Sequence, residues 1–317
     1  MKKLLLLSMT LILLSCGNSS KNKGQTQDDA QVPTETEVKA PVEEVVPTFN
    51  YVSPAPQDGK LKGVVEMGSA GFNFFIINLD KDKNWKLEKA KFGESGVYEN
   101  IASETDVLNK LRAFIKEMID FGVRGSNIHF VVSSGAVKED AVVKITAALK
   151  KIGYIVNTVT PEQEGAYALK TTLPKQYENK GFIVDIGSSN TKISWMDNGK
   201  IGALETFGSR YKSKDISEDD AFKTVTGISR QIPEVCREIC FIIGGVPYSL
   251  ADSHRKDNER YTVLKSEKGY TSEKFQDDRS IGGLNIYKAI RESTGCKMFV
   301  FDFDSNFTIG FLLTIPY

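Results

Sequence analysis

The chain has 317 residues, with 41 basic and 41 acidic side chains, and therefore carries no formal net charge. Nucleic-acid-binding proteins usually show a basic excess, so this balance argues against nucleic acid as a partner. The length is sufficient for one large or two medium domains with a substantial core.

The first 15 residues have the pattern of an export signal. Lys2 and Lys3 precede an apolar run over residues 4–14, and that run is too short for a normal membrane span. Ser15 followed by Cys16 resembles the bacterial lipobox, which implies cleavage before Cys16 and lipidation of its sulfur. The alternative is an ordinary secretory signal with a chance cysteine. The segment predicts a lipid-anchored protein of the cell envelope, on the periplasmic side or in the outer membrane, with the membrane as a partner.

Residues 16–58 are predicted to form a disordered acidic tether. Between residues 25 and 50 the sequence has six acids and one base, Lys39, among many Ser, Thr, Gln and Pro residues. Such a segment cannot bury enough apolar surface to offset the entropy lost on ordering. The folded part is expected to begin at residue 59, with one half over 59–180 and a second over 181–317.

Hydrophobic periodicity predicts alternating strands and helices in the first half. A turn of small residues at 68–71 separates the first two strands, and Ser103 with Asp106 has the spacing of a helix capping box. The expected strands are 61–67, 72–79, 128–132 and 154–159, and the expected helices are 103–122, 141–152 and 161–169.

The second half repeats this alternation, which is typical of layered α/β folds. Its expected elements are a strand–turn–strand unit over 182–196, strands at 200–204, 241–243 and 298–303, and helices at 218–231 and 284–292.

The two halves begin alike. The stretches GVVEMGSAGFNFFI (63–76) and FIVDIGSSNTKISW (182–195) both place an acid near the end of an apolar run, followed by Gly, Ser and two small residues. Glu66 and Asp185 are the acids in register. This agreement predicts a structural duplication in which each half opens with a β-hairpin.

Small-residue turns of this kind favour phosphate binding. Glycine allows close backbone approach, and successive N–H groups form a concavity for anions. An acid beside such a concavity is suited to hold a hydrated Mg²⁺ that bridges to phosphate, a role predicted for Glu66 and Asp185. The alternative is a pair of ordinary hairpins with solvated acids.

Five stretches, in order, resemble the exopolyphosphatase/guanosine pentaphosphate phosphatase (Ppx/GppA) family, within the actin–sugar kinase–Hsp70 fold. These stretches are 66–71, 134–138, 160–165, 185–191 and 244–247, and residues 304–313 more loosely resemble the closing helix of that family. The resemblance implies an α/β fold with two similar actin-like, ribonuclease H-like halves around an interdomain cleft.

The resemblance also implies roles for particular residues. Glu164 would activate the attacking water, as a carboxylate stabilised near the start of a helix; the alternative is a first-turn glutamate that only favours the helix dipole. The implied cofactor is Mg²⁺, and the implied partner is polyphosphate or a phosphorylated small molecule. The implied phosphate-binding residues are Gly68, Ser69, Lys138, Gly187, Ser188, Ser189, Asn190, Thr191, Gly244 and Gly245.

The chain departs from the family pattern at several of these positions. Glu66 stands where the first motif has Asp, and Lys138 replaces an Arg, which keeps the charge but loses the bidentate fork. In the second motif Ser188, Ser189 and Asn190 replace two glycines and a serine, and Lys192 replaces an acid. Lys138 and Lys192 are also consistent with ordinary solvated lysines, and Gly244 with Gly245 with a plain strand-to-helix turn.

Three functions are compatible with these observations. The first is a Mg²⁺-dependent phosphohydrolase acting on polyphosphate or a phosphorylated nucleotide. The second is a non-catalytic lipoprotein of the same fold that binds a ligand or partner protein, since an exported protein meets little nucleotide. A sugar kinase is a weaker third, because ATP would be lacking there. A homodimer is a further candidate arrangement, and the three cysteines after Cys16 allow at most one disulfide.

Overall fold

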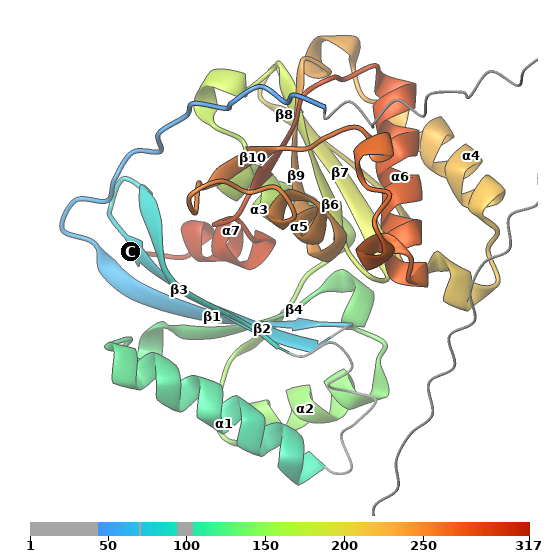
Figure 1. Ribbon diagram of the computed structural model, residues 1–317. Coiled ribbons are helices and arrows are strands. Elements are labelled where there is room, and N and C mark those ends of the chain that lie inside the picture. The colour runs from blue at the N-terminus through green and yellow to red at the C-terminus, as the bar shows by residue number, and fades with distance from the viewer. Residues whose placement is uncertain (1–43, 70, 94–103) are drawn as a thin grey trace, which may run out of the picture. The chain divides into compact units, whose positions relative to one another are not determined.

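The computed structural model describes residues 44–69, 71–93 and 104–317 (Figure 1). Two β-sheets organise these residues. The first sheet has the strand order β3-β2-β1-β4-β5 and the second has the order β10-β11-β9-β6-β7-β8. The strands are β1 (Lys60–Gly68), β2 (Gly71–Leu79), β3 (Trp85–Phe92), β4 (Ile128–Val132), β5 (Val156–Thr158), β6 (Gly181–Ile186), β7 (Asn190–Asp197), β8 (Lys200–Phe207), β9 (Ile239–Gly244), β10 (Tyr261–Val263) and β11 (Phe299–Asp302).

The two sheets share one topology. Each begins with an antiparallel three-stranded meander, β1–β3 or β6–β8, and continues with strands parallel to the first strand, β4 and β5 or β9 and β11. Glu66 near the end of β1 and Asp185 near the end of β6 therefore occupy equivalent places. The predicted α/β fold with two similar halves is confirmed.

Helices cover both sheets. Helices α1 and α2 pack on one face of the first sheet, and α4, α5 and α6 belong to the core on one face of the second (Figure 1). Successive side chains of a strand point to opposite faces of the sheet, so β1 contributes to two separate cores. Val65 faces α1 and α2, whereas Val64 faces the core that contains α3 and α7. The helices are α1 (Glu104–Phe121), α2 (Asp140–Lys151), α3 (Pro161–Thr172), α4 (Glu218–Ser229), α5 (Gly245–Asp252), α6 (Asp278–Thr294) and α7 (Phe307–Thr314).

Helices α3 and α7 connect the two halves. Helix α3 follows the first sheet in the sequence but packs on β6, β7 and β8, while α7 packs on α3 and on β1 and β2. The two helices come so close that a Cβ at Gly310 would lie 1.9 Å from the carbonyl oxygen of Tyr167. Glycine at this position therefore allows the packing that joins the sheets.

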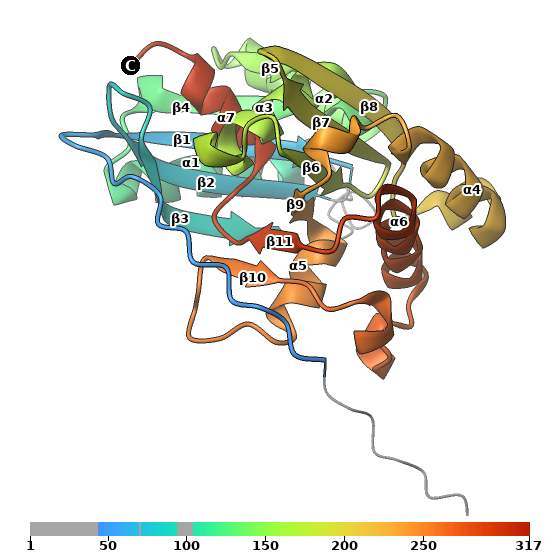
Figure 2. The ribbon, with the colours of Figure 1, turned by 90° about the horizontal axis from the view of Figure 1, so that it is seen from above.

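The structure corrects the predicted tether over residues 44–58. Phe49 packs against Phe241 and Tyr261, with ring centroids 5.5 and 5.4 Å apart, and the Glu44 carboxylate accepts a hydrogen bond from the Ser266 N–H. Figure 2 shows this segment passing alongside β10. The segment is polar on average, but its aromatic residues are concentrated in this part. They supply enough apolar surface for this part to pack on the folded domain. The signal segment, Cys16 and the rest of the tether lie outside the described residues.

Several expected boundaries shift for local reasons. Helix α6 begins at Asp278 rather than near residue 284, because the Asp277 side chain accepts hydrogen bonds from the N–H groups of Arg279 and Ser280 and so caps the helix. Helix α1 is followed by Gly122 at φ 109°, as the sequence indicates, whereas Ser103 of the expected capping box lies outside the described residues.

The three cysteines of the folded part are buried free thiols: Cys236, Cys240 and Cys296. The helices of residues 44–69, 71–93 and 104–317 include none with the length and apolar character needed to cross a bilayer.

Candidate functional site

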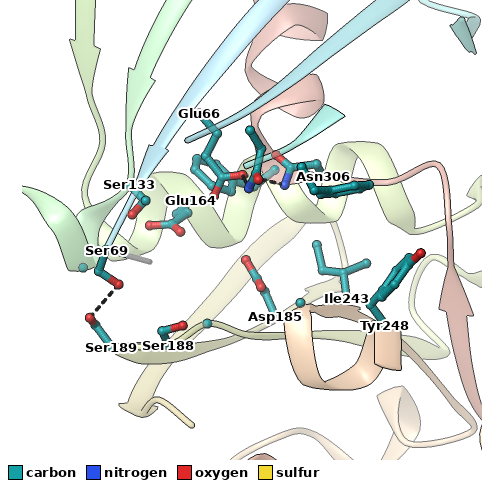
Figure 3. Close-up of a pocket in the computed structure, with 18 of the residues that line it drawn as sticks. Glu66, Ser69, Ser133, Glu164, Asp185, Ser188, Ser189, Ile243, Tyr248 and Asn306 are labelled. Carbon is teal, nitrogen blue, oxygen red and sulfur yellow. Dashed lines mark hydrogen bonds between the residues drawn. The ribbon is translucent and has the colours of Figure 1, made fainter. Parts of the chain in front are cut away.

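A pocket of about 450 Å³ lies where the β1–β2 and β6–β7 hairpin turns meet. Figure 3 shows side chains from both sheets and from the segment before α7 surrounding it. Most residues of the sequence-predicted site contribute to its lining: Glu66, Gly68, Ser69, Glu164, Asp185, Gly187, Ser188, Ser189, Asn190, Gly244 and Gly245.

Two predicted phosphate ligands lie elsewhere. Lys138 is exposed in the turn before α2 and is not part of the pocket lining. Thr191 is fully buried in β7, because alternation along the strand directs Asn190 and Lys192 toward the pocket and Thr191 away from it. Neither Lys138 nor Thr191 therefore lines this pocket, and their phosphate contacts stay predictions.

The two hairpin turns touch each other. The Ser189 hydroxyl donates a hydrogen bond of 2.9 Å to the Ser69 hydroxyl (Figure 3). On its other side the second turn is held by hydrogen bonds from the N–H groups of residues 208–210 to the carbonyls of residues 187–189. The N–H groups of Ser188 and Ser189 donate to no acceptor within the described part of the chain. Successive N–H groups left without a protein acceptor form a concavity suited to an anion.

A half-buried carboxylate, Glu66, and a buried one, Asp185, face each other across the pocket. Figure 3 shows Glu66 entering from the first sheet and Asp185 from the second. One oxygen of Glu66 accepts hydrogen bonds from the amides of Asn73 (2.9 Å) and Asn306 (3.1 Å). The Asp185 carboxylate accepts none from the residues that the structure describes, although only 8 % of the residue is exposed.

Burial raises the pKa of both carboxyl groups. Desolvation is the main cause for Glu66, whose pKa is raised to about 7, and the charge of Asp185 adds to it. Desolvation likewise raises the pKa of Asp185 to about 6, against the opposing charge of Lys192. The pocket therefore holds two carboxyl groups that change protonation close to neutral pH.

Glu164 is held in a network of its own. Thr160 and Gln163 form a reciprocal capping box at the start of α3, which places Glu164 in the first turn of the helix. Its Oε1 accepts a hydrogen bond of 2.5 Å from the Lys192 ammonium, and its Oε2 accepts from the N–H and hydroxyl of Ser134 at 2.9 and 2.5 Å. Because both oxygens already accept from protein groups, the structure does not favour Glu164 as the base that takes a proton from water.

Lys192 is the cation of this network. Its side chain is 5 % exposed and that of Glu164 is 2 % exposed. Desolvation lowers the pKa of Lys192, but the charges of Glu164, Asp185 and Glu66 outweigh this effect and raise it above its ordinary value. In the sequence, Lys192 was recognised only as a departure from a motif. The alternation of side chains along β7 was a signal for its position, because it places Lys192 on the same side as Asn190.

Arg279 is a pocket residue that the sequence analysis missed. Gly245 makes room for it, because a Cβ there would lie 2.1 Å from Nη2 of Arg279. The buried Nε of Arg279 has no hydrogen-bond partner within the described ranges. A guanidinium that lines a pocket without a protein acceptor is well suited to bind a phosphate or carboxylate of a ligand.

Part of the pocket has aromatic walls. Tyr248 lies 5.6 Å from Phe303, and Phe303 lies 4.7 Å from Phe301, measured between ring centroids. All three rings, together with Phe92, line the pocket. This arrangement offers an apolar surface to the part of a ligand that carries no charge.

The described residues do not form an all-protein cage for Mg²⁺. Among the described residues no group of three or more His, Cys, Asp or Glu side chains is arranged to hold a metal ion. Mg²⁺ requires near-octahedral oxygen coordination, whereas the Glu164 oxygens are bonded to Lys192 and Ser134. The cation observed among the carboxylates is the Lys192 ammonium.

A pH dependence of stability follows from the raised pKa values. Because Asp185 titrates near 6 and Glu66 near 7 in the folded protein, the folded state binds more protons than the unfolded state between about pH 4 and 7. The protonated carboxyl groups therefore stabilise the folded protein fully at a pH below their pKa values in the unfolded chain. This stabilisation is lost as the pH rises through their pKa values in the folded protein. The free energy of unfolding should therefore fall with rising pH by up to about 3 kcal/mol less in Asp185→Asn than in the wild type, since one pKa unit corresponds to about 1.4 kcal/mol.

Denaturant unfolding of the wild type and of Asp185→Asn at about pH 4 and about pH 8 measures this difference. An equal loss of stability in both proteins would show that Asp185 does not carry a raised pKa.

Solved structures share this fold. The crystal structure of the Aquifex aeolicus member of the Ppx/GppA protein family is 16% identical, covers 80% of this chain and 97% of its own, and has a TM-score of 0.59. An exopolyphosphatase from Cytophaga hutchinsonii is 12% identical, with 80% and 97% of the two chains covered and a TM-score of 0.60. No protein-family model and no curated protein matches the sequence. The chain therefore has the actin-like fold of the Ppx/GppA structures, with one pocket built where its two similar halves meet.

Proposed function

We propose that the protein is a phosphohydrolase that releases phosphate from polyphosphate or a phosphorylated small molecule bound in this pocket. The observation that supports the proposal is a single pocket lined by two small-residue hairpin turns, by Arg279 and by Asp185, a carboxylate without a hydrogen-bond partner among the described residues. The shared fold with an exopolyphosphatase supports the same class of substrate.

The pocket residues have separate roles in binding the substrate and in activating water. The N–H groups of Ser188 and Ser189 and the guanidinium of Arg279 bind phosphoryl oxygens, and the aromatic walls accept an uncharged part of the substrate. Phosphoryl transfer depends mainly on positioning and on charge stabilisation, so these donors supply most of the catalysis. Asp185 takes the proton from the attacking water. Its pKa of about 6 leaves it ionised at neutral pH and still basic, which suits a general base.

A phosphate-release assay on the full chain tests this function. Substrates of different chain length and chemistry, such as pyrophosphate, tripolyphosphate, long-chain polyphosphate and nucleoside triphosphates, identify the class that is cleaved. Asp185→Asn is expected to lower the rate by about 10²–10⁴-fold, because an amide cannot take the proton. Asp140→Asn, at an exposed position of α2, is the matched control and should retain the wild-type rate.

The second candidate is a catalytically inactive protein that binds a phosphorylated ligand or a partner. The hydrogen bonds that occupy both oxygens of Glu164 favour it. Wild-type protein that binds tripolyphosphate but releases no phosphate from any member of the panel would decide for this candidate.

We further propose that Cys16 is lipidated and that the protein is anchored in the cell envelope. The proposal rests on the charged, apolar and Ser15–Cys16 segments of the sequence. A Cys16→Ser variant that still fractionates with membranes as a processed protein would contradict it.

A further inference from the structure

We propose that the ammonium group of Lys192 takes the place of a divalent cation in this pocket, so that the site holds phosphoryl groups without a metal ion. The inference rests on the proposed function, because it concerns how that same site accommodates an anion. It differs from the sequence-based expectation of a Mg²⁺ held by Glu66 and Asp185.

The register of the hairpins places Lys192 among the carboxylates. Lys192 pairs with Asp185 across β6 and β7, and the equivalent pair in the first half is Asn73 with Glu66. The same position in the two hairpins thus carries a neutral amide in one half and an ammonium in the other. Each of these side chains lines the pocket.

Lys192 is fixed in this position by its contacts. Its Nζ lies 2.5 Å from Oε1 of Glu164, and Glu164 is in turn held by Ser134. The charges of Glu164, Asp185 and Glu66 all act on the ammonium. A cation that is bonded to the chain, buried and paired cannot be removed by a chelator.

The same arrangement disfavours a metal ion. A divalent cation beside the ammonium would meet a like charge at short range in a buried site, where such repulsion is weakly screened. It would also have to displace Lys192 or Ser134 to reach the oxygens of Glu164. With three carboxyl groups and one ammonium present, the remaining negative charge is reduced by the raised pKa values of Glu66 and Asp185.

Direct metal binding to the full chain tests the inference. Mn²⁺ serves as the probe, because its free form gives an electron paramagnetic resonance signal that binding removes. We expect the wild type to leave this signal unchanged and Lys192→Gln to reduce it. The shorter, uncharged glutamine would leave space for the metal ion and would remove the positive charge that repels it. Lys144→Gln, an exposed lysine of α2, is the matched control and should behave like the wild type.

Inorganic phosphate is the second probe, titrated by calorimetry with EDTA and with Mg²⁺. The wild type should bind phosphate with similar affinity in both buffers, and Lys192→Gln should bind about tenfold or more weakly in EDTA than in Mg²⁺. If Lys192→Gln does not fold, Lys192→Gln combined with Glu164→Gln removes the buried pair together and allows the same Mn²⁺ measurement.

The two probes separate the two proposals. Wild-type protein that removes the free Mn²⁺ signal, or that binds phosphate only with Mg²⁺, would overturn the role of Lys192. Wild-type protein that binds neither phosphate nor tripolyphosphate under any condition would overturn the proposed function, while the Mn²⁺ comparison would still decide whether Lys192 excludes the metal.

Discussion

Replacing Glu164 with glutamine is expected to lower the free energy of unfolding by about 3–5 kcal/mol, because it leaves a buried ammonium without its partner. Lys192 is 5 % and Glu164 2 % exposed, so water cannot replace the lost charge. The loss should lie near the lower end of this range, since Asp185 and Glu66 still attract Lys192. Denaturant unfolding followed by circular dichroism measures it.

Two further variants identify the cause of this loss. Glu162→Gln changes an exposed glutamate two residues earlier in the first turn of α3 and should cost less than about 1 kcal/mol, the size of a helix-dipole effect. Glu164→Gln with Lys192→Met removes both charges and should recover part of the stability, because a buried pair is costly mainly when one partner is missing. A double variant no more stable than Glu164→Gln alone would refute the ion-pair explanation.

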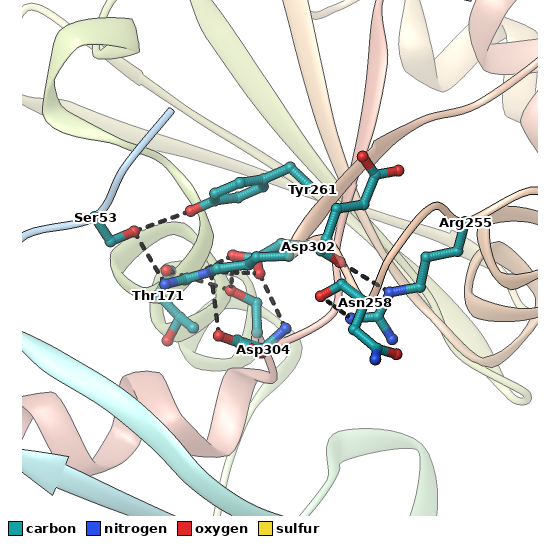
Figure 4. Close-up of polar contacts among 10 residues, drawn as sticks. Ser53, Thr171, Arg255, Asn258, Tyr261, Asp302 and Asp304 are labelled. Atoms are coloured by element: carbon teal, nitrogen blue, oxygen red, sulfur yellow. Dashed lines mark hydrogen bonds and ion pairs between the residues drawn. The ribbon is translucent and has the colours of Figure 1, made fainter. Parts of the chain in front are cut away.

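Replacing Asp302 with alanine is expected to be as destabilising, by about 3–5 kcal/mol, for the same reason. Asp302 is fully buried in β11 and binds Arg260 through two hydrogen bonds of 2.9 Å, from Nε and from Nη2. It also accepts hydrogen bonds from the Asp304 N–H and the Ser305 hydroxyl. Figure 4 shows Asp302 and Asp304 beside Tyr261 and Ser53. Alanine would remove the acceptor of the Nε and Nη2 groups of Arg260, of the Asp304 N–H and of the Ser305 hydroxyl, and would leave the guanidinium only Ser53 and the Asp304 carboxylate, 3.6 Å from Nε.

The Arg260 group also connects distant parts of the chain. Its guanidinium lies 4.7 Å from the ring centroid of Trp85 in β3, and its Nη1 donates a hydrogen bond to Ser53 at 3.0 Å. Asp302→Ala should therefore increase hydrogen exchange near Trp85 and in residues 44–58 as well as in β11. Asp278→Asn, at a residue whose side chain is 82 % exposed, is the control for loss of a carboxylate alone. Unchanged exchange at both distant segments would contradict this connecting role.

Much of the fold could be predicted because the pattern of the sequence was local. The duplicated apolar–acid–small pattern gave the correct relation between β1–β2 and β6–β7, since period-2 burial and glycine turns are set by neighbouring residues. The edge strand β3 was not predicted because four of its eight residues are Lys or Glu, which leaves a weak apolar signal. Helix α5 was not among the expected elements, although the alternative of a strand-to-helix turn at Gly244 and Gly245 implied a helix directly after β9.

The chemistry of the site depended on contacts between distant segments. Whether Glu164 is free or paired is decided by Lys192, 28 residues away, and by Ser134, 30 residues away. Arg279 reaches the pocket only because Gly245 of another element lacks a side chain. A motif can place a carboxylate near a helix start, but the groups that its oxygens bind become visible only in the folded chain.

Calorimetric titration of the full chain with tripolyphosphate, in EDTA and again in Mg²⁺, tests most directly whether this pocket binds phosphoryl groups. We expect the wild type to bind one tripolyphosphate, and Arg279→Gln to bind about 10–150-fold more weakly, because a hydrogen bond to a charged group contributes about 1.5–3 kcal/mol. Absence of binding by the wild type in both buffers, or equal affinities for the wild type and Arg279→Gln, would contradict the account.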